Sequence, residues 1–392
     1  MNKKLSVILI GLMIVSLVTV FPIKVNASTT DHVPLQEWVT GWNNKVAISA
    51  DGNYTVVGDT SGYISLFHKD SETRLWMFDA DAPINEVDIS ADGMYLVAGD
   101  TFGYMWFFNR TSNVPMWIFD AEDLVGVSIS ATGFYVTGGD SSGLSLFNRT
   151  SNSPCWSDGP SVDGVISADG RYVCTKIATG IRLINTSSGT SFWSKYNIGY
   201  FSDPKISADG QYILATNPTR LIRNTTYLLD NAGSFIWNYT SPSQQWASDM
   251  SEDGVHILIA DLAGKVALLN NTSNSTIWSD TFSGNDPRIR ISADGNYFAV
   301  GNGNNLYLYN TTTQALLWTA LASYSAKSLD MSANGDYIVL GSDLHTYLFH
   351  RVNEPSPEDG GPGIPGFELM GVLIAALVAS IWSINRRKFS EI

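Results

Sequence analysis

One short motif, Ser-Ala-Asp-Gly in its clearest copies, recurs along nearly the whole chain. Each copy follows an apolar residue, and consecutive copies are 37 to 44 residues apart. A period near 40 residues with strand-like content is typical of repeated four-stranded β units. The repeat therefore predicts a series of similar all-β modules. The apolar residues that begin the copies are Ile48, Ile89, Ile129, Ile166, Ile206, Met250, Ile291 and Met331.

Each period divides into four strands and three turns. Asp-Gly between alternating apolar runs is a strong hairpin signal, because glycine tolerates a positive φ angle and aspartate bonds to its own backbone. The second repeat shows the order most clearly. Its predicted strands are residues 85–90, 94–100, 104–109 and 116–120.

Tryptophan gives an independent count of the repeats. A Trp lies in the predicted fourth strand of the first seven units, whereas the eighth unit enters a linker before its fourth strand. Trp38 precedes the first unit, so we expect residues 35–40 to complete the last unit and close a ring. Residues 33–352 then form an eight-bladed β-propeller with four antiparallel strands per blade, with seven blades as the alternative if one unit is irregular. The seven tryptophans are Trp76, Trp117, Trp156, Trp193, Trp237, Trp278 and Trp318.

The residues also resemble known repeat families. The pattern that begins at Ser49, SADGxYxxxG, resembles the first half of WD40-like blades, and the LFNRTSNxPxW pattern that begins at Leu146 is similar to quinoprotein dehydrogenase-like propellers. The second family implies eight blades. The resemblance is to a fold that hosts both enzymes and binding scaffolds, and it carries over no quinone or metal ligand.

The two ends of the chain look like targeting segments. Lys3 and Lys4 precede an apolar run, and small residues at 25–27 offer a cleavage site, so residues 1–27 are predicted to be a secretory signal peptide. An uncleaved N-terminal anchor is the alternative.

The C-terminal region combines a linker and an apolar segment. Residues 353–366 form a Pro/Gly-rich acidic linker, and residues 367–388 form an apolar segment that ends in a basic cluster, followed by a short tail at 389–392. This pattern predicts a transmembrane helix with its basic end in the cytoplasm. The Pro-Gly-Phe sequence at 365–367 also resembles the archaeal sorting signals read by archaeosortases, which implies cleavage and attachment to a lipid. In either case the propeller is expected at the extracellular face of the membrane.

Charge excludes one class of partner. The chain has 23 basic and 37 acidic residues, and the two end segments hold six of the basic and two of the acidic residues, so the remaining part has a net charge of −18. Such a surface repels nucleic acid and anionic lipid.

Propeller topology sorts the glycosylation sequons. First and third turns of a four-stranded meander lie on one face, and second turns and blade connections lie on the other. Eight of the ten sequons beyond the signal peptide fall in first or third turns, which predicts glycans mainly on that face. Turn residues also produce sequons by chance. The eight are Asn53, Asn109, Asn148, Asn185, Asn270, Asn271, Asn274 and Asn310, and the other two are Asn224 and Asn238.

The opposite face is predicted to carry acidic loops. Repeated Gly-Asp second turns and acidic blade connections cluster in the first three units, and carboxylate oxygens are the ligands that Ca²⁺ prefers. No EF-hand spacing is present, and most of these aspartates are explained as turn formers, so no cofactor is expected, with Ca²⁺ as the alternative. The weak metal candidates are Asp79, Asp81, Asp120, Glu122 and Asp123.

Catalytic signals are sparse. The five histidines share no metal-ligand spacing, and the Gly-Asp-Ser-Ser-Gly sequence at 139–143 is one of three repeated turns. Cys155 and Cys174 are candidates for a disulfide or for a pair of buried thiols. We therefore expect a non-catalytic scaffold that binds a protein or cell-envelope component on the unglycosylated face. The alternative is a propeller enzyme that uses the central channel, for which the candidate lining residues are Asn85, Asp163, Asp203 and Arg288.

Overall fold

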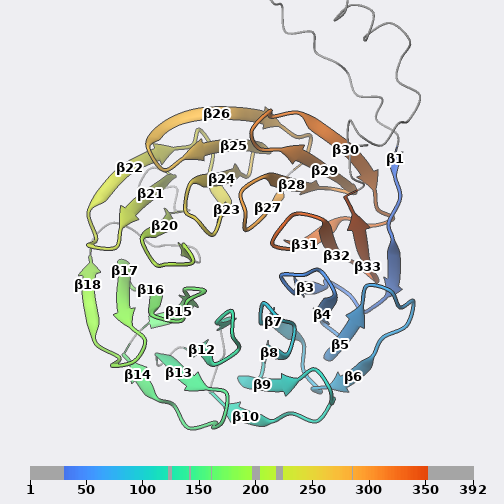
Figure 1. Cartoon of the computed structure of the whole chain (residues 1–392), viewed down its shortest axis with the longest axis vertical. Helices are drawn as coiled ribbons and strands as arrows, with labels where there is room; N and C mark the ends of the chain where they lie inside the picture. Colours follow the sequence, from blue (N-terminus) through green and yellow to red (C-terminus); the bar gives the residue numbers. More distant parts are fainter. Residues whose placement is uncertain are drawn as a thin grey trace, which may run out of the picture. The chain divides into compact units, whose positions relative to one another are not determined.

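The computed structural model describes residues 31–121, 126–140, 143–159, 161–196, 204–217, 224–284 and 286–351. Eight sheets are arranged in a ring, each with four antiparallel strands and one of them with a fifth, parallel strand. The first of the four strands lies near the centre and the fourth lies toward the rim (Figure 1). The predicted all-β, eight-bladed architecture is confirmed, and the seven-bladed alternative is wrong. The predicted signal peptide, linker and C-terminal segment lie outside the described residues. Among the described residues, no helix is long and apolar enough to cross a membrane.

The strands follow the repeat. Blades 1 to 4 comprise β3(Lys45–Ile48), β4(Tyr54–Gly58), β5(Tyr63–His68) and β6(Trp76–Asp79); β7(Ile84–Ile89), β8(Tyr95–Asp100), β9(Tyr104–Asn109) and β10(Trp117–Asp120); β11(Gly126–Ile129), β12(Tyr135–Gly139), β13(Leu144–Asn148) and β14(Trp156–Asp158); and β15(Ser161–Ile166), β16(Tyr172–Ile177), β17(Gly180–Asn185) and β18(Ser191–Lys195). Blades 5 to 8 comprise β19(Lys205–Ile206), β20(Tyr212–Asn217), β21(Thr225–Asp230) and β22(Phe235–Thr240); β23(Gln245–Met250), β24(His256–Asp261), β25(Lys265–Asn270) and β26(Ser273–Thr281); β27(Arg288–Ile291), β28(Tyr297–Asn302), β29(Asn305–Asn310) and β30(Leu316–Leu321); and β31(Ala326–Met331), β32(Tyr337–Ser342), β33(His345–His350) and β2(Gln36–Val39).

The N-terminal strand closes the ring as the tryptophan count predicts. Strand β2 pairs antiparallel with β33, so Trp38 lies in the fourth strand of blade 8. The other seven tryptophans lie in the fourth strands of blades 1 to 7. A short strand, β1(Asp31–His32), adds parallel to β30 in blade 7. The N-terminal strands β1 and β2 thus pair with strands of blades 7 and 8, and these hydrogen bonds close the ring.

The apolar core lies between neighbouring sheets. Second and third strands are buried on both faces, and each apolar cluster combines side chains of adjacent blades. Between blades 1 and 2, for example, Val56 and Leu66 pack with Ile89 and Leu96. Closely packed apolar surface is the main stabilising term in folding. Each blade therefore depends on its neighbours, which explains why the repeats form a ring.

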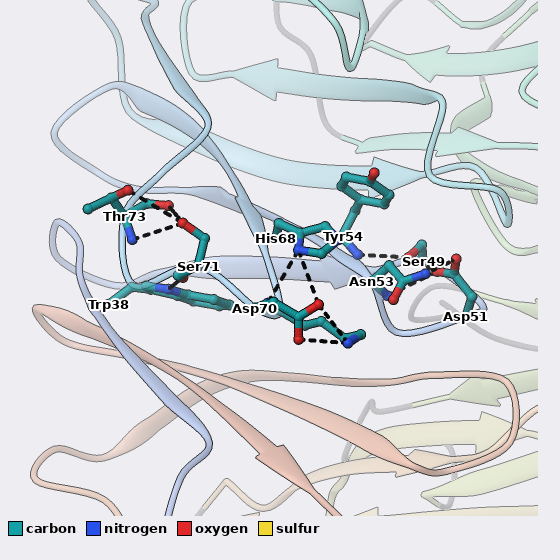
Figure 2. A network of polar contacts seen from close by, with 10 residues as sticks. Trp38, Ser49, Asp51, Asn53, Tyr54, His68, Asp70, Ser71 and Thr73 are labelled. Carbon is teal, nitrogen blue, oxygen red and sulfur yellow. Dashed lines mark hydrogen bonds and ion pairs between the residues drawn. The ribbon is translucent and has the colours of Figure 1, made fainter.

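The repeated motif builds the first turn of every blade. In blade 1 the Ser49 hydroxyl donates to Asp51 Oδ1 at 2.6 Å, and the backbone N–H of Tyr54 donates to Ser49 Oγ at 3.0 Å (Figure 2). Gly52 has a φ of 73°, which a residue with a Cβ rarely adopts. Every motif serine is at most 1% exposed, so it serves the backbone and offers no surface for a ligand. The eight serines are Ser49, Ser90, Ser130, Ser167, Ser207, Ser251, Ser292 and Ser332.

Motif turns also connect blades. The Ala50 N–H donates to Ala91 O at 3.0 Å, and the Ala333 N–H of the last blade donates to Ala50 O at 2.9 Å. The motif glycine packs on an aromatic ring of the preceding blade, so that a Cβ on Gly52 would lie 2.1 Å from the Tyr337 ring. These contacts make the motif part of the scaffold.

The outer-strand tryptophans bind the next blade. Each of six indole N–H groups donates to a backbone carbonyl in the third turn that follows, at 2.7 to 3.1 Å. Trp38 makes this bond to Ser71 O at 2.9 Å and so joins blade 8 to blade 1 (Figure 2). The tryptophan repeat is therefore explained by contacts between blades. The six donors are Trp38, Trp76, Trp117, Trp156, Trp193 and Trp237.

Candidate binding face and central channel

Backbone hydrogen bonds assign the turns to two faces. First and third turns of one blade are joined, as where the Lys69 N–H donates to Asn53 O at 2.9 Å. Second turns are joined to blade connections, as where the Thr60 N–H donates to Trp42 O at 3.0 Å. We call the face that carries the first and third turns the motif face, and the face that carries the second turns and the blade connections the connection face. The arrangement agrees with the one that the topology predicts.

First strands line a central channel with alternate side chains. The residue just before the motif's apolar position faces the middle of the channel, where a cavity of about 360 Å³ contains Asp88, Asp249 and Asp330. Each of these carboxylates accepts a hydrogen bond from a backbone N–H of the following blade, at 2.9 Å in all three cases. The channel carboxylates therefore also join blades.

The buried charges of the channel interact strongly. Burial raises the pKa of Asp88 to about 6, and the carboxylate of Asp330 adds to the shift. Burial also raises the pKa of Asp330, although its ion pair with Arg290 at 3.2 Å acts in the opposite direction. For Arg290 burial favours loss of the proton, but Asp249 and Asp330 outweigh it and raise its pKa. Arg290 therefore stays charged beside the acidic groups.

The two mouths of the channel differ in charge. The motif-face mouth is a recess of about 560 Å³ lined by the motif turns of blades 5 to 8, with Asp209, Glu252, Asp253 and Asp294 around it. Burial raises the pKa of Glu252. The connection-face mouth is a cavity of about 270 Å³ whose charged residues are mostly cations: Lys45, Lys205, Arg288, Arg290 and Lys327, with Glu86 as the one acidic residue among its described lining.

Large aromatic side chains are exposed on the connection face. One lies in a second turn, three lie in connections between blades, and one lies near the start of the first strand β23. Aromatic residues are enriched in protein interfaces and supply much of their binding energy. The five are Trp42 (55% exposed), Phe102 (64%), Tyr196 (58%), Trp246 (39%) and Tyr324 (36%).

Second-turn aspartates of the predicted acidic loops accept hydrogen bonds from the backbone of their own turns. Asp59 is 4% exposed and accepts from the N–H groups of Ser61 and Tyr63, and Asp100 is fully buried. The expected acidic patch on this face is therefore reduced by burial of its second-turn aspartates.

The weak metal candidates lie on the blade connections. Asp79 Oδ1 accepts from the Asp81 N–H at 3.1 Å, and Asp79 and Asp120 are exposed, while Glu122 and Asp123 lie outside the described residues. Within the described ranges, no group of three acidic, histidine or cysteine side chains could hold a metal ion.

Two of the four predicted channel residues line the channel. Asp163 contributes to the central cavity and Arg288 to the connection-face mouth. Asn85 is not among the lining residues, because its neighbour Glu86 takes that position, and Asp203 lies outside the described residues. The sequence reasoning missed the charged residues directly before the motif. Their signal is a fixed position in the repeat, which is charged in five of the eight units: Asp88, Lys205, Asp249, Arg290 and Asp330.

The sequons follow the predicted division of faces. Asn53 lies between β3 and β4, and most of the others end a third strand. Asn109 Oδ1 accepts from the N–H and the hydroxyl of Thr111, a turn that occupies the amide oxygen and leaves the nitrogen as the group for a glycan. One prediction needs correction: β26 begins at Ser273, so Asn274 lies in an outer strand rather than in a turn. Asn224 precedes β21 at the connection face, and Asn238 lies within β22.

The two cysteines are free thiols in different surroundings. Cys174 is fully buried among apolar side chains of blades 4 and 5, and burial raises its pKa to about 12. Cys155 is exposed beside the outer strand of blade 3. The candidate disulfide is not formed in the structure, and the alternative of two buried thiols fails because only one is buried.

These features define an eight-bladed β-propeller with a charged channel. No family model matches the chain, and no curated protein matches it by sequence. Among solved structures, the chain is similar to the C-terminal WD40 domain of Sif2, with a TM-score of 0.66, 16% identity, and coverage of 83% of this chain and 97% of that one.

Two further solved structures show the same fold. BamB from Moraxella catarrhalis gives a TM-score of 0.64 at 15% identity over 82% of this chain and 100% of that one. Sqt1 from Saccharomyces cerevisiae gives 0.69 at 9% identity over 83% and 100%. The likeness to WD40-like and BamB-like propellers is therefore one of fold.

Proposed function

We propose that this protein is a non-catalytic binding scaffold of the cell surface, which contacts another protein or a cell-envelope component through its connection face. The five exposed aromatic side chains of that face carry the proposal. Exposed rings set on a rigid ring of sheets lose little conformational entropy on binding, so they suit a contact surface.

The ends of the chain and the sequons support the orientation. Residues 1–27 direct export, and the segment at 367–388 holds the chain at the membrane, either as a helix or after cleavage and attachment to a lipid. Glycans on the motif face cover the side that presents seven of the ten sequons in turns. The connection face then remains open to a partner.

Capture experiments with the full chain test the binding face. A triple variant, Trp42→Ala, Phe102→Ala and Tyr324→Ala, is compared with wild type after chemical cross-linking on intact cells. The matched control removes three exposed rings near the motif-face ends of blades, Phe134, Phe192 and Phe235. We expect a cross-linked partner that the triple variant loses and the control keeps. Equal capture by both variants refutes the assignment of the face.

Cofactor analysis tests the non-catalytic part of the proposal. The absorbance spectrum and elemental content of the purified full chain are measured. A stoichiometric quinone or metal ion would overturn the proposal in favour of a propeller enzyme that uses the channel.

A further inference from the structure

The connection-face mouth concentrates positive charge in an acidic protein. The whole chain has a net charge of −14. Five of its 23 basic residues nevertheless line this one cavity of about 270 Å³. Like charges held close together repel each other, so such a cluster needs compensation from neighbouring or bound anions.

Internal partners compensate only part of the cluster. Arg290 pairs with Asp330 at 3.2 Å, and Lys327 pairs with Asp343 at 3.2 Å. Lys205 and Arg288 form no ion pair with any residue that the structure describes. Their nearest electrostatic partners, Asp88 for Lys205 and Asp286 for Arg288, act without a direct ion pair. Two cations that no ion pair occupies therefore share the cavity, each from the first strand of its blade.

Arg288 is held in place without a polar partner for its Nε atom. The guanidinium lies over the Trp246 ring, with its central carbon 5.2 Å from the ring centroid, which is a cation–π contact. Its Nε is buried and has no hydrogen-bond partner. A buried, unpaired N–H of a charged group is costly, and burial accordingly lowers the pKa of Arg288. Arg288 as a whole is only partly buried and lines the cavity, so its guanidinium is available to a ligand there.

We propose that the connection-face mouth binds an oxyanion, a phosphate or carboxylate group, between Arg288 and Lys205. The planar guanidinium suits two oxygens of one group, and the lysine ammonium supplies a point charge. The volume fits a small anion or a single acidic side chain and excludes a larger polyanion. The oxyanion comes from a free small molecule or from an acidic side chain of a bound protein, and only the second source rests on the proposed binding role of this face.

Titration calorimetry and thermal unfolding of the purified full chain test the site. Inorganic phosphate and malonate probe free anions, and a hexaglutamate peptide probes acidic side chains. The variants are Arg288→Gln, Lys205→Met and the double variant. Arg74→Gln is the control, because Arg74 is an exposed arginine of a motif-face third turn. Circular dichroism of each variant confirms folding, and competition by chloride in the wild type gives a readout that needs no variant.

We expect saturable binding that each cavity variant weakens at least about tenfold, that the control leaves unchanged and that chloride weakens. Binding of phosphate or malonate supports the free anion, and binding of hexaglutamate alone supports the acidic side chain. Absence of binding by all three probes, or equal binding by the double variant and wild type, overturns the site. Neither result affects the aromatic test of the proposed partner contact.

Discussion

Closure of the ring depends on Trp38, and its replacement gives a quantitative test of the fold. The side chain is 1% exposed, stacks on Phe67 with ring centroids 4.4 Å apart and donates its indole N–H to Ser71 O at 2.9 Å. Loss of a buried aromatic side chain to alanine costs about 3–5 kcal/mol of unfolding free energy. The hydrogen bond alone contributes about 1 kcal/mol. We expect Trp38→Ala to cost about 4 kcal/mol and Trp38→Phe, which keeps the stacked ring, a smaller part of it.

Urea unfolding followed by circular dichroism measures the effect. Trp42 is the matched control, because it lies four residues further on and is 55% exposed. We expect Trp42→Ala to change the unfolding free energy by about 0.5 kcal/mol or less, as surface substitutions do. The denaturant slope should be unchanged if the substitutions act on the folded state. Equal unfolding midpoints for the two alanine variants would refute the role of Trp38 in closure.

Three further results are expected. Because burial raises the pKa of Asp88 from 3.8 to about 6, the folded chain keeps a proton there that the unfolded chain releases. The unfolding free energy therefore falls as pH rises from about 4 to 6, by about 1.4 kcal/mol per unit of pKa difference, and Asp88→Asn, measured by urea unfolding across that window, removes this contribution. Gly335 has a φ of 70°, and a Cβ there would lie 2.7 Å from the Tyr297 ring, so Gly335→Ala should cost at least about 1 kcal/mol, whereas Gly159→Ala, with no atom within 4 Å, should cost far less. Glycopeptide mass spectrometry should find higher occupancy at the seven motif-face sequons than at Asn224, Asn238 and Asn274, and even occupancy would contradict the covered face.

The number of blades and their closure could be predicted because they depend on local and repeated signals. Asp-Gly turns specify the first hairpin, and the outer-strand tryptophan makes the same contact to the next blade in six blades. The displaced Trp38 marked the closing strand for the same reason. A signal that recurs eight times at spacings of 37 to 44 residues leaves little freedom in the assignment.

The channel was harder to predict because it depends on register. A shift of one residue in a first strand exchanges the channel side with the core side. The sequence pattern points to Asn85, whereas Glu86 faces the channel in the structure, and the register irregularity between Ile84 and Glu86 contributes to that difference. The sequence does not single out Asp88, because an aspartate beside a motif isoleucine resembles a strand-end residue. Its hydrogen bond from the Ile129 N–H of the next blade is a tertiary contact that a local pattern does not show.

The total charge of a chain predicts long-range attraction and repulsion, but it does not predict the charge of a single cavity. Many acidic residues of this chain accept hydrogen bonds from backbone N–H groups of their own turns, as Asp51 and Asp59 do. The cations at the connection-face mouth have fewer such partners, since Lys205 and Arg288 face the cavity from first strands. The −14 charge of the chain argues against a long polyanion, which must approach the whole surface. It permits a small oxyanion, because at physiological salt charges more than about 8 Å away are largely screened and the nearest charges decide the binding.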